Sequence, residues 1–125
     1  MVDRALVTIL GIDHVQVAAP AGCEQAARAF YGGLLELDEL AKPAPLAARG
    51  GCWFRAGAQE LHVGVENAFA PARKAHPGFL VSDLAALGDR LRAAGVDVVA
   101  DETIPGVERS YVDDPFGNRI ELRQA

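Results

Sequence analysis

Three histidines and one glutamate have the residue types and the spacing of a metal site. His14, His62 and His76 are the three histidines of the chain, and they lie, like Glu121, on the polar side of segments in which apolar and polar residues alternate. Imidazole nitrogens and a carboxylate oxygen suit Zn, Ni, Fe(II) or Mn(II), and two histidines with one carboxylate leave positions open for a substrate. A lone strand histidine is more often a surface or hydrogen-bonded core residue, but four such residues at equivalent positions of a repeat favour a metal.

The elements that must position these side chains follow one another as strand, helix and three strands, and this order occurs twice. In the first half we predict strands at 12–18, 35–40, 52–55 and 59–66 and a helix at 22–33 that ends at Gly32-Gly33. In the second half we predict strands at 76–81, 96–100, 109–113 and 119–123, and a helix that begins after Ser82 as N-cap and ends at Gly95. Residues 1–10 read as an edge strand or a partly ordered lead-in, and 42–51 as a loop.

This order predicts a single α+β domain, residues 1–125, built from an internal repeat. Its two βαβββ modules span 11–66 and 76–123, and 67–75 connect them. Each module has one helix, which covers one face of its sheet, so the other face must form a cleft or be covered by something else. That second face carries the polar residues, so we expect all three histidines and Glu121 to lie on one surface.

Charge and composition exclude several classes of protein. The net charge is -5 and no basic run is present, which argues against a nucleic-acid partner. No segment is long and apolar enough to span a membrane. Cys23 and Cys52 form no CxxC motif and no secretory segment precedes them, so we expect reduced thiols in a cytoplasmic protein.

Three motifs, together with the paired layout, resemble a known family. They are Asp13-His14-Val15, Ala29-Phe30-Tyr31 and the closing segment Asp114-Pro115-Phe116-Gly117-Asn118-Arg119-Ile120-Glu121-Leu122. Over residues 11–123 the chain resembles the vicinal oxygen chelate superfamily, which includes glyoxalase I, methylmalonyl-CoA epimerase, extradiol dioxygenases, fosfomycin-resistance thiol transferases and bleomycin-resistance proteins. The resemblance implies that paired modules form an incomplete barrel around the site. It also implies a homodimer with the site at the subunit interface.

The resemblance implies roles for particular residues. The metal-ligand positions of the family fall on His14, His76 and Glu121, and Glu121 would also be the catalytic residue that moves a proton. His62 occupies a fourth position that glyoxalase I fills with Glu, which leaves open whether His62 binds the metal or lines the cavity.

Four further residues are expected to bind substrate. Gln16 shares the face of His14, and Tyr111 aligns with a substrate-contacting tyrosine of the fosfomycin-resistance enzymes. Arg109 has the same parity as Tyr111 and could hold an anionic group, and Trp53 could form an apolar wall. For Trp53 a core position is an equal alternative, and for Arg109 a solvated rim position is the stronger one.

The function implied is that of a metal-dependent enzyme acting on a small molecule with adjacent oxygens, either a lyase or isomerase or a thiol transferase. The alternative is a metal-free protein of the bleomycin-resistance type, which sequesters a drug. A third possibility is a protein that shares the fold without either activity, because fold does not imply function. An extradiol dioxygenase would share the three ligands, but such chains are generally longer. The sequence does not distinguish a glutathione hemithioacetal, a CoA thioester and an antibiotic epoxide.

Overall fold

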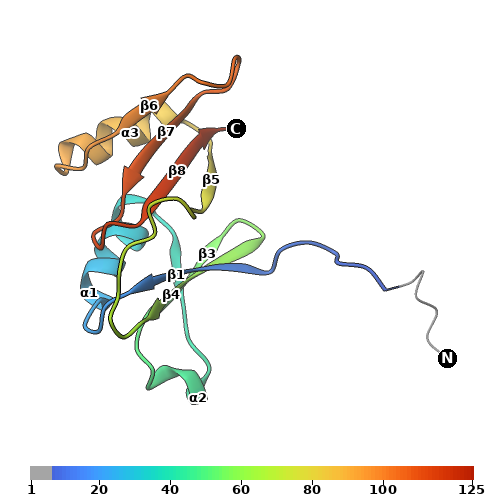
Figure 1. Cartoon of the computed structure of the whole chain (residues 1–125), viewed down its shortest axis with the longest axis vertical. Coiled ribbons are helices and arrows are strands. Elements are labelled where there is room, and N and C mark those ends of the chain that lie inside the picture. Colours follow the sequence, from blue (N-terminus) through green and yellow to red (C-terminus); the bar gives the residue numbers. More distant parts are fainter. Residues whose placement is uncertain (1–6) are drawn as a thin grey trace.

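The computed structural model describes residues 7–125, which form two four-stranded sheets with the same strand order (Figure 1). The first sheet contains β1 (His14–Ala19), β4 (Gln59–Val65), β3 (Cys52–Ala56) and β2 (Asp38–Leu40). The second contains β5 (Gly78–Val81), β8 (Arg119–Gln124), β7 (Arg109–Asp113) and β6 (Val99–Asp101). In each sheet the first two strands are parallel and the remaining pairs antiparallel. The prediction of an α+β fold with two similar modules is therefore confirmed.

The helices differ from the prediction in type and in their ends. The first is a short α-helix, α1 (Glu24–Ala27), that continues as a π-helical segment, η2 (Arg28–Leu34). It includes the glycine pair and ends at Leu34, one residue beyond the predicted end, and Glu36 shortly after it takes a positive φ of 58°. The second-module helix, α3 (Leu84–Ala93), has Asp83 rather than Ser82 as its N-cap, since the Asp83 carboxylate accepts the Ala86 amide at 3.0 Å. No helix within residues 7–125 has the length and apolarity that crossing a membrane would require.

Several strands are shorter than predicted. β1 begins at residue 14, β2 at 38 and β6 at 99, and residues 7–13 have no regular structure. β5 begins at Gly78, so His76 lies in the connector just before the strand. The predicted loop at 42–51 contains a one-turn helix, α2 (Ala44–Ala47), which follows Pro43. The part of the predicted lead-in at 1–6 lies outside the described residues.

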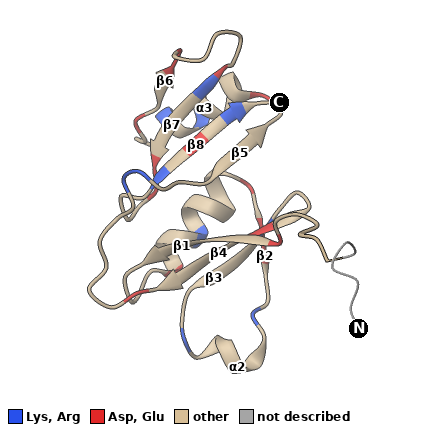
Figure 2. Ribbon diagram, turned by 45° about the vertical axis from the view of Figure 1, so that its right-hand side comes forward, with Lys and Arg blue, Asp and Glu red and all other residues tan. Residues whose placement is uncertain are grey.

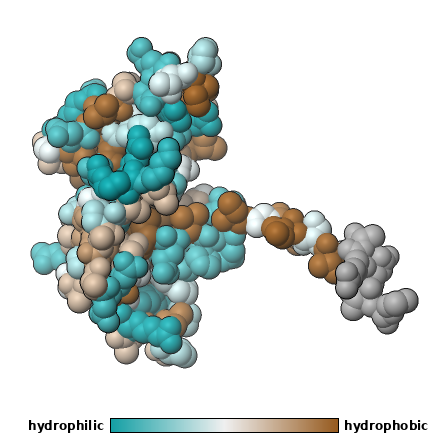
Figure 3. Space-filling model, viewed as in Figure 1, coloured by the Kyte–Doolittle hydropathy of each residue, from teal (hydrophilic) through white to brown (hydrophobic). Residues whose placement is uncertain are grey.

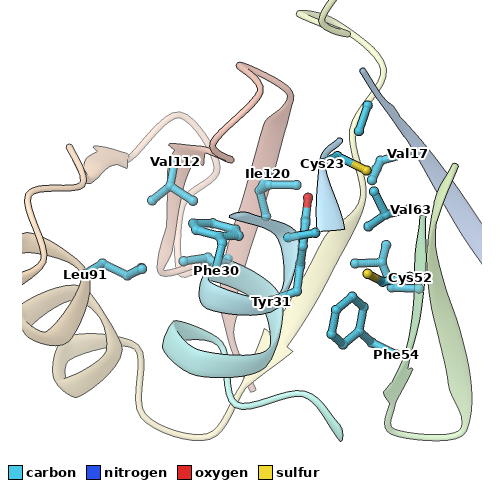
Figure 4. Packing of buried hydrophobic residues seen from close by; sticks show 14 of the residues in the cluster. Val17, Cys23, Phe30, Tyr31, Cys52, Phe54, Val63, Leu91, Val112 and Ile120 are labelled. Atoms are coloured by element: carbon cyan, nitrogen blue, oxygen red, sulfur yellow. The ribbon is translucent and has the colours of Figure 1, made fainter. Parts of the chain in front are cut away.

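Both modules pack their apolar faces into one shared core. Phe30 and Tyr31 of η2 lie between the sheets, with Val63 and Phe54 on one side and Ile120 on the other (Figure 4). Tyr31 and Phe54 are fully buried, and their ring centroids are 5.8 Å apart. Because side chains alternate along a strand, the polar residues of each sheet must point away from this core.

A buried polar network joins the two modules beside that core. Asp114, which is 4% exposed, accepts hydrogen bonds from the Tyr31 hydroxyl at 2.7 Å and from the backbone amides of Phe116 and Asn118 at 2.9 Å. The Asn118 side-chain amide donates to the carbonyl of Ala18 in β1 at 2.7 Å. The Asp-Pro-Phe-Gly-Asn motif therefore ties the β7–β8 turn to the first sheet.

Both cysteines are free and buried, and burial raises the pKa of both thiols, that of Cys23 to about 11. The unfolded chain therefore loses its thiol protons at a lower pH than the folded chain, and the free energy of unfolding must fall as pH rises from about 9 to about 11. We expect a thiol reagent to label neither cysteine of the folded protein near pH 8 but both in denaturant. We also expect Cys23→Ala to flatten the alkaline fall. Rapid labelling of the folded protein, or an equal fall in Cys23→Ala, would contradict this prediction.

Candidate functional site

The polar face of the second sheet gathers its predicted site residues around one carboxylate. Glu121 Oε1 lies 3.1 Å from His76 Nε2, 3.2 Å from the Tyr111 hydroxyl and 3.4 Å from an Arg109 guanidinium nitrogen. Strand register explains the arrangement, because Tyr111 of β7 is directly opposite Glu121 of β8, and Gly78 of β5 is opposite on the other side. Gly78 has no side chain, so the approach to Glu121 from that strand stays open.

The hydrogen bonds of His76 determine which of its nitrogens can bind another group. Its Nδ1 lies 2.8 Å from the carbonyl oxygen of Lys74. A carbonyl only accepts, so Nδ1 carries the proton, and in the neutral ring Nε2 has a free lone pair. This lone pair is directed at Glu121 Oε1, which is also an acceptor. Two acceptors 3.1 Å apart repel each other unless a cation or a shared proton lies between them.

Arg109 is held within the protein rather than at a rim. Its guanidinium donates to Asp101 at 3.3 Å, to the Thr103 hydroxyl at 3.0 Å and to Glu121 at 3.4 Å. Its side chain is 15% exposed, and its buried Nε has no hydrogen-bond partner among the described residues. Arg109 thus helps to orient the Glu121 carboxylate. The pKa of Asp101 is lowered, chiefly because Asp101 accepts hydrogen bonds from the Thr103 hydroxyl and amide, and then by the Arg109 charge.

The polar face of the first sheet carries a stack of three parallel rings. Trp53 lies on His62 with ring centroids 3.9 Å apart and planes 3° apart, and His62 lies on His14 at 4.2 Å and 14°. The register places Trp53, His62 and Gln16 side by side across β3, β4 and β1. Both ring faces of His62 are covered, and His62 is only 5% exposed.

The partners of the stacked histidines give them different roles. His62 Nε2 is 2.9 Å from Glu60 Oε1, so Nε2 donates and is committed to that carboxylate. His14 Nδ1 is 2.9 Å from Asp13 Oδ2, which leaves Nε2 of a neutral His14 free. The His14 side chain is 45% exposed. His14 therefore has the free nitrogen of a ligand, whereas His62 supports the His14 ring by stacking.

Gln16 lies across the sheet over a glycine. A Cβ at Gly64 would be 2.8 Å from the side-chain nitrogen of Gln16, closer than real Cβ contacts allow. Gly64 therefore creates the space that lets the Gln16 amide lie beside His62. The amide presents both a donor and an acceptor on the same face as His14.

One chain does not bring the three proposed ligands together, in contrast to the expectation of one surface. The described residues contain no group of three His, Cys, Asp or Glu side chains placed to hold a metal ion. His14 and His62 belong to the first sheet, whereas Glu121 belongs to the second and His76 lies in the connector just before β5. The reason is the shared core, since each sheet turns its apolar face inward and its polar face outward.

Sequence reasoning missed residues that contribute to the site. Glu60 and Asp13 orient two histidines, and Arg119 lies on the site face of β8 with its guanidinium carbon 3.8 Å from the centre of the Tyr111 ring. Basic and acidic residues alternate along β8 on this face (Figure 2). Arg119 has the same parity as Glu121, and that signal could have found it. The contacts of Glu60 depend on a side-chain conformation that the sequence pattern does not specify.

Comparison with known proteins identifies the family. Residues 11–122 match the model of the Glyoxalase/Bleomycin resistance protein/Dioxygenase superfamily. The chain belongs to this superfamily. The expected resemblance is thereby confirmed, and it covers nearly the whole chain. Comparison with curated proteins found no match to this superfamily member.

Solved structures agree with the fold of this glyoxalase-superfamily chain. A glyoxalase family protein from Bacillus anthracis is 52% identical, with a TM-score of 0.92 over 94% of this chain and 97% of that one. A lactoylglutathione lyase from Agrobacterium tumefaciens is 22% identical with a TM-score of 0.72, and 94% of this chain and 95% of that one are covered. The fosfomycin resistance protein FosX from Listeria monocytogenes has 15% identity and a TM-score of 0.75, with the same coverage. The last two similarities concern the fold alone.

Proposed function

We propose that this protein is a metal-dependent enzyme whose site forms between two copies of the chain. His14 of one copy and His76 with Glu121 of the other are the proposed ligands of one divalent ion. The proposed reaction is a lyase, isomerase or thiol-transfer step on a small molecule with adjacent oxygens. The observation that carries the proposal is the 3.1 Å spacing of His76 Nε2 and Glu121 Oε1.

The donor set fits a divalent metal. Two ligand atoms that each bind one ion at about 2.1 Å lie about 3 Å apart, which is the spacing of His76 Nε2 and Glu121 Oε1. In each proposed histidine ligand, Nδ1 donates its proton to an oxygen and Nε2 is left to bind the ion. Metal-binding histidines usually form such a hydrogen bond through the ring nitrogen that does not bind the metal. A bound divalent ion would act as a Lewis acid that polarises a substrate oxygen.

The side chains of this protein would perform the remaining steps. Glu121 is the proposed proton carrier, and its contacts with Tyr111 and Arg109 keep its carboxylate in one orientation beside His76. The Tyr111 hydroxyl can donate to a developing negative charge on the substrate. Gln16 and the Trp53–His62–His14 stack would form the opposite wall of the site.

Exposed apolar surface supports the second copy. Residues 7–12 extend away from the body, and Ile9 and Leu10 are 91% and 95% exposed (Figure 3). Leu80 on the edge strand β5 is 75% exposed. It lines a groove of about 690 Å³ between the sheets, together with Val15 and Phe79. Exposed apolar side chains of this kind are typical of an interface.

The test compares turnover with and without metal. We would load the full chain with Mn, Ni, Zn or Fe(II) and assay a glutathione hemithioacetal, a CoA thioester and an antibiotic epoxide. We expect turnover of one of them to fall at least about 100-fold with a chelator and to return with metal, because the Lewis acid is lost and restored. The proposal fails if the protein retains no metal, or if a chelator leaves its turnover unchanged. Binding of a bleomycin-type drug by metal-free protein would then favour ligand sequestration.

A further inference from the structure

Arg119 holds a positive charge beside Glu121 that no carboxylate in the described part of the chain neutralises. It lies two residues before Glu121 in β8, on the same face of the sheet. Its guanidinium stacks on Tyr111, and no carboxylate among residues 7–125 forms an ion pair with it. Stacking fixes the plane of the guanidinium while leaving its edge donors available.

Arg119 and Tyr111 line a cavity of about 1050 Å³, and the Tyr111 hydroxyl donates to Glu121 at 3.2 Å. The other arginine of this cavity, Arg73, is paired with Asp113 at 3.0 Å. Phe30, Leu34 and Val99 supply apolar lining. The cavity thus combines an apolar wall with one cation whose donors remain unfilled.

Four carboxylates line the cavity, and none of them forms an ion pair with Arg119. Asp113, which lies directly opposite Arg119 in the strand register, pairs with Arg73. Asp101 pairs with Arg109, and Asp114 is buried in hydrogen bonds with Tyr31 and Asn118. Asp97 is exposed, where water screens its charge. The unfilled guanidinium therefore remains the strongest local attraction for an anion.

We propose that Arg119 binds an oxyanion, a carboxylate or a phosphonate, on a substrate whose apolar part lies against Leu34 and Val99. This inference rests on the proposed function, since it assigns the substrate class of the same site. A planar guanidinium binds two oxygens of such a group at once. Residues two apart on a strand face are about 7 Å apart, so the anionic group would lie about that far from the atoms that react at Glu121.

The test uses phenylphosphonate and benzoate as probes of the full chain, by titration calorimetry at low salt. The variant is Arg119→Gln, and the matched control is Arg123→Gln, which removes the same charge from the same strand face without touching the cavity. We expect at least one probe to bind, and Arg119→Gln to weaken that binding about 10-fold or more, since hydrogen bonds to charged groups have this effect. Arg123→Gln should change Kd by less than about 2-fold, which is the size of a screened surface charge effect.

The result is independent of the metal because each titration is run on chelator-treated and on metal-loaded protein. If no metal binds but Arg119→Gln still weakens the probe, the proposed function fails and the anion site stands. The anion site is overturned if neither probe binds, or if Arg119→Gln and Arg123→Gln bind as the unmodified chain does. Circular dichroism of both variants checks folding, and Arg119→Lys, which keeps the charge without the planar fork, should bind with intermediate affinity.

Discussion

Replacing Asp114 by Ala is expected to lower the free energy of unfolding by about 3–5 kcal/mol, because it removes the acceptor of a buried network. The Tyr31 hydroxyl, the amides of Phe116 and Asn118 and the Asn118 side chain would all lose their partner. Each is enclosed, so water cannot replace the lost bond without opening the junction of the two modules. Burial, and then the adjacent Asp114 charge, also raises the pKa of Tyr31, so this tyrosine stays neutral and donating.

Guanidinium denaturation measures the change, and Asp113→Ala is the matched control. Asp113 is the neighbouring residue, its side chain is 54% exposed, and it forms only a surface ion pair with Arg73. Its replacement should change the free energy of unfolding by less than about 1 kcal/mol. Tyr31→Phe removes one donor and should have an intermediate effect. An Asp114→Ala variant as stable as Asp113→Ala would mean that the network does not hold the modules together.

Replacing Glu121 or His14 by Ala is expected to abolish binding of the divalent ion. Either replacement leaves only two of the three protein ligands. In the His14 variant the two remaining ligands come from the same copy, so the ion no longer bridges the subunits. Glu121→Ala should also abolish turnover, because the same carboxylate is the proposed proton carrier. Metal content per chain after dialysis, measured by elemental analysis, gives the result directly.

A control variant separates loss of a ligand from loss of negative charge. Glu66 follows the last residue of β4 and is exposed, with no role in either polar cluster. Glu66→Ala should bind as much metal as the unmodified chain. His62→Ala should keep part of the metal, because it removes the stacking support of His14 but no ligand. Equal loss in Glu66→Ala would indicate nonspecific binding by an acidic protein.

The strands that carry the site were predictable because their residue pattern matches their environment. In β4, Leu61 and Val63 face the core as the alternation predicts, although His62 between them is also buried, because it stacks with Trp53 and His14 on the polar face. β8 behaves in the same way with Ile120 and Leu122. The parity of Glu121 and Tyr111 on the opposite face followed from the same rule.

The remaining features depend on contacts between distant segments. The stack of Trp53, His62 and His14 forms only when three strands pair in the right register. A local sequence pattern does not determine that register. The π-helical end of η2 arises from packing and a positive φ at Glu36, whereas the glycine pair suggested an earlier stop. The closing motif was recognisable as a family signature, but the role of Asp114 in joining the modules appears only when Tyr31 and β1 are placed beside it.

The central claim is that one ion is held between two copies, and a mixture of His14→Ala with Glu121→Ala tests it most directly. The two chains, differently tagged, would be denatured together, refolded with metal, and purified as the mixed pair. In a two-fold symmetric pair one of the two sites then contains both substitutions, and the other has His14, His76 and Glu121 intact. We predict about one ion per mixed pair, about two per unmodified pair and none in either variant alone. A mixed pair without metal, beside an unmodified pair that binds it, would contradict a site shared between subunits.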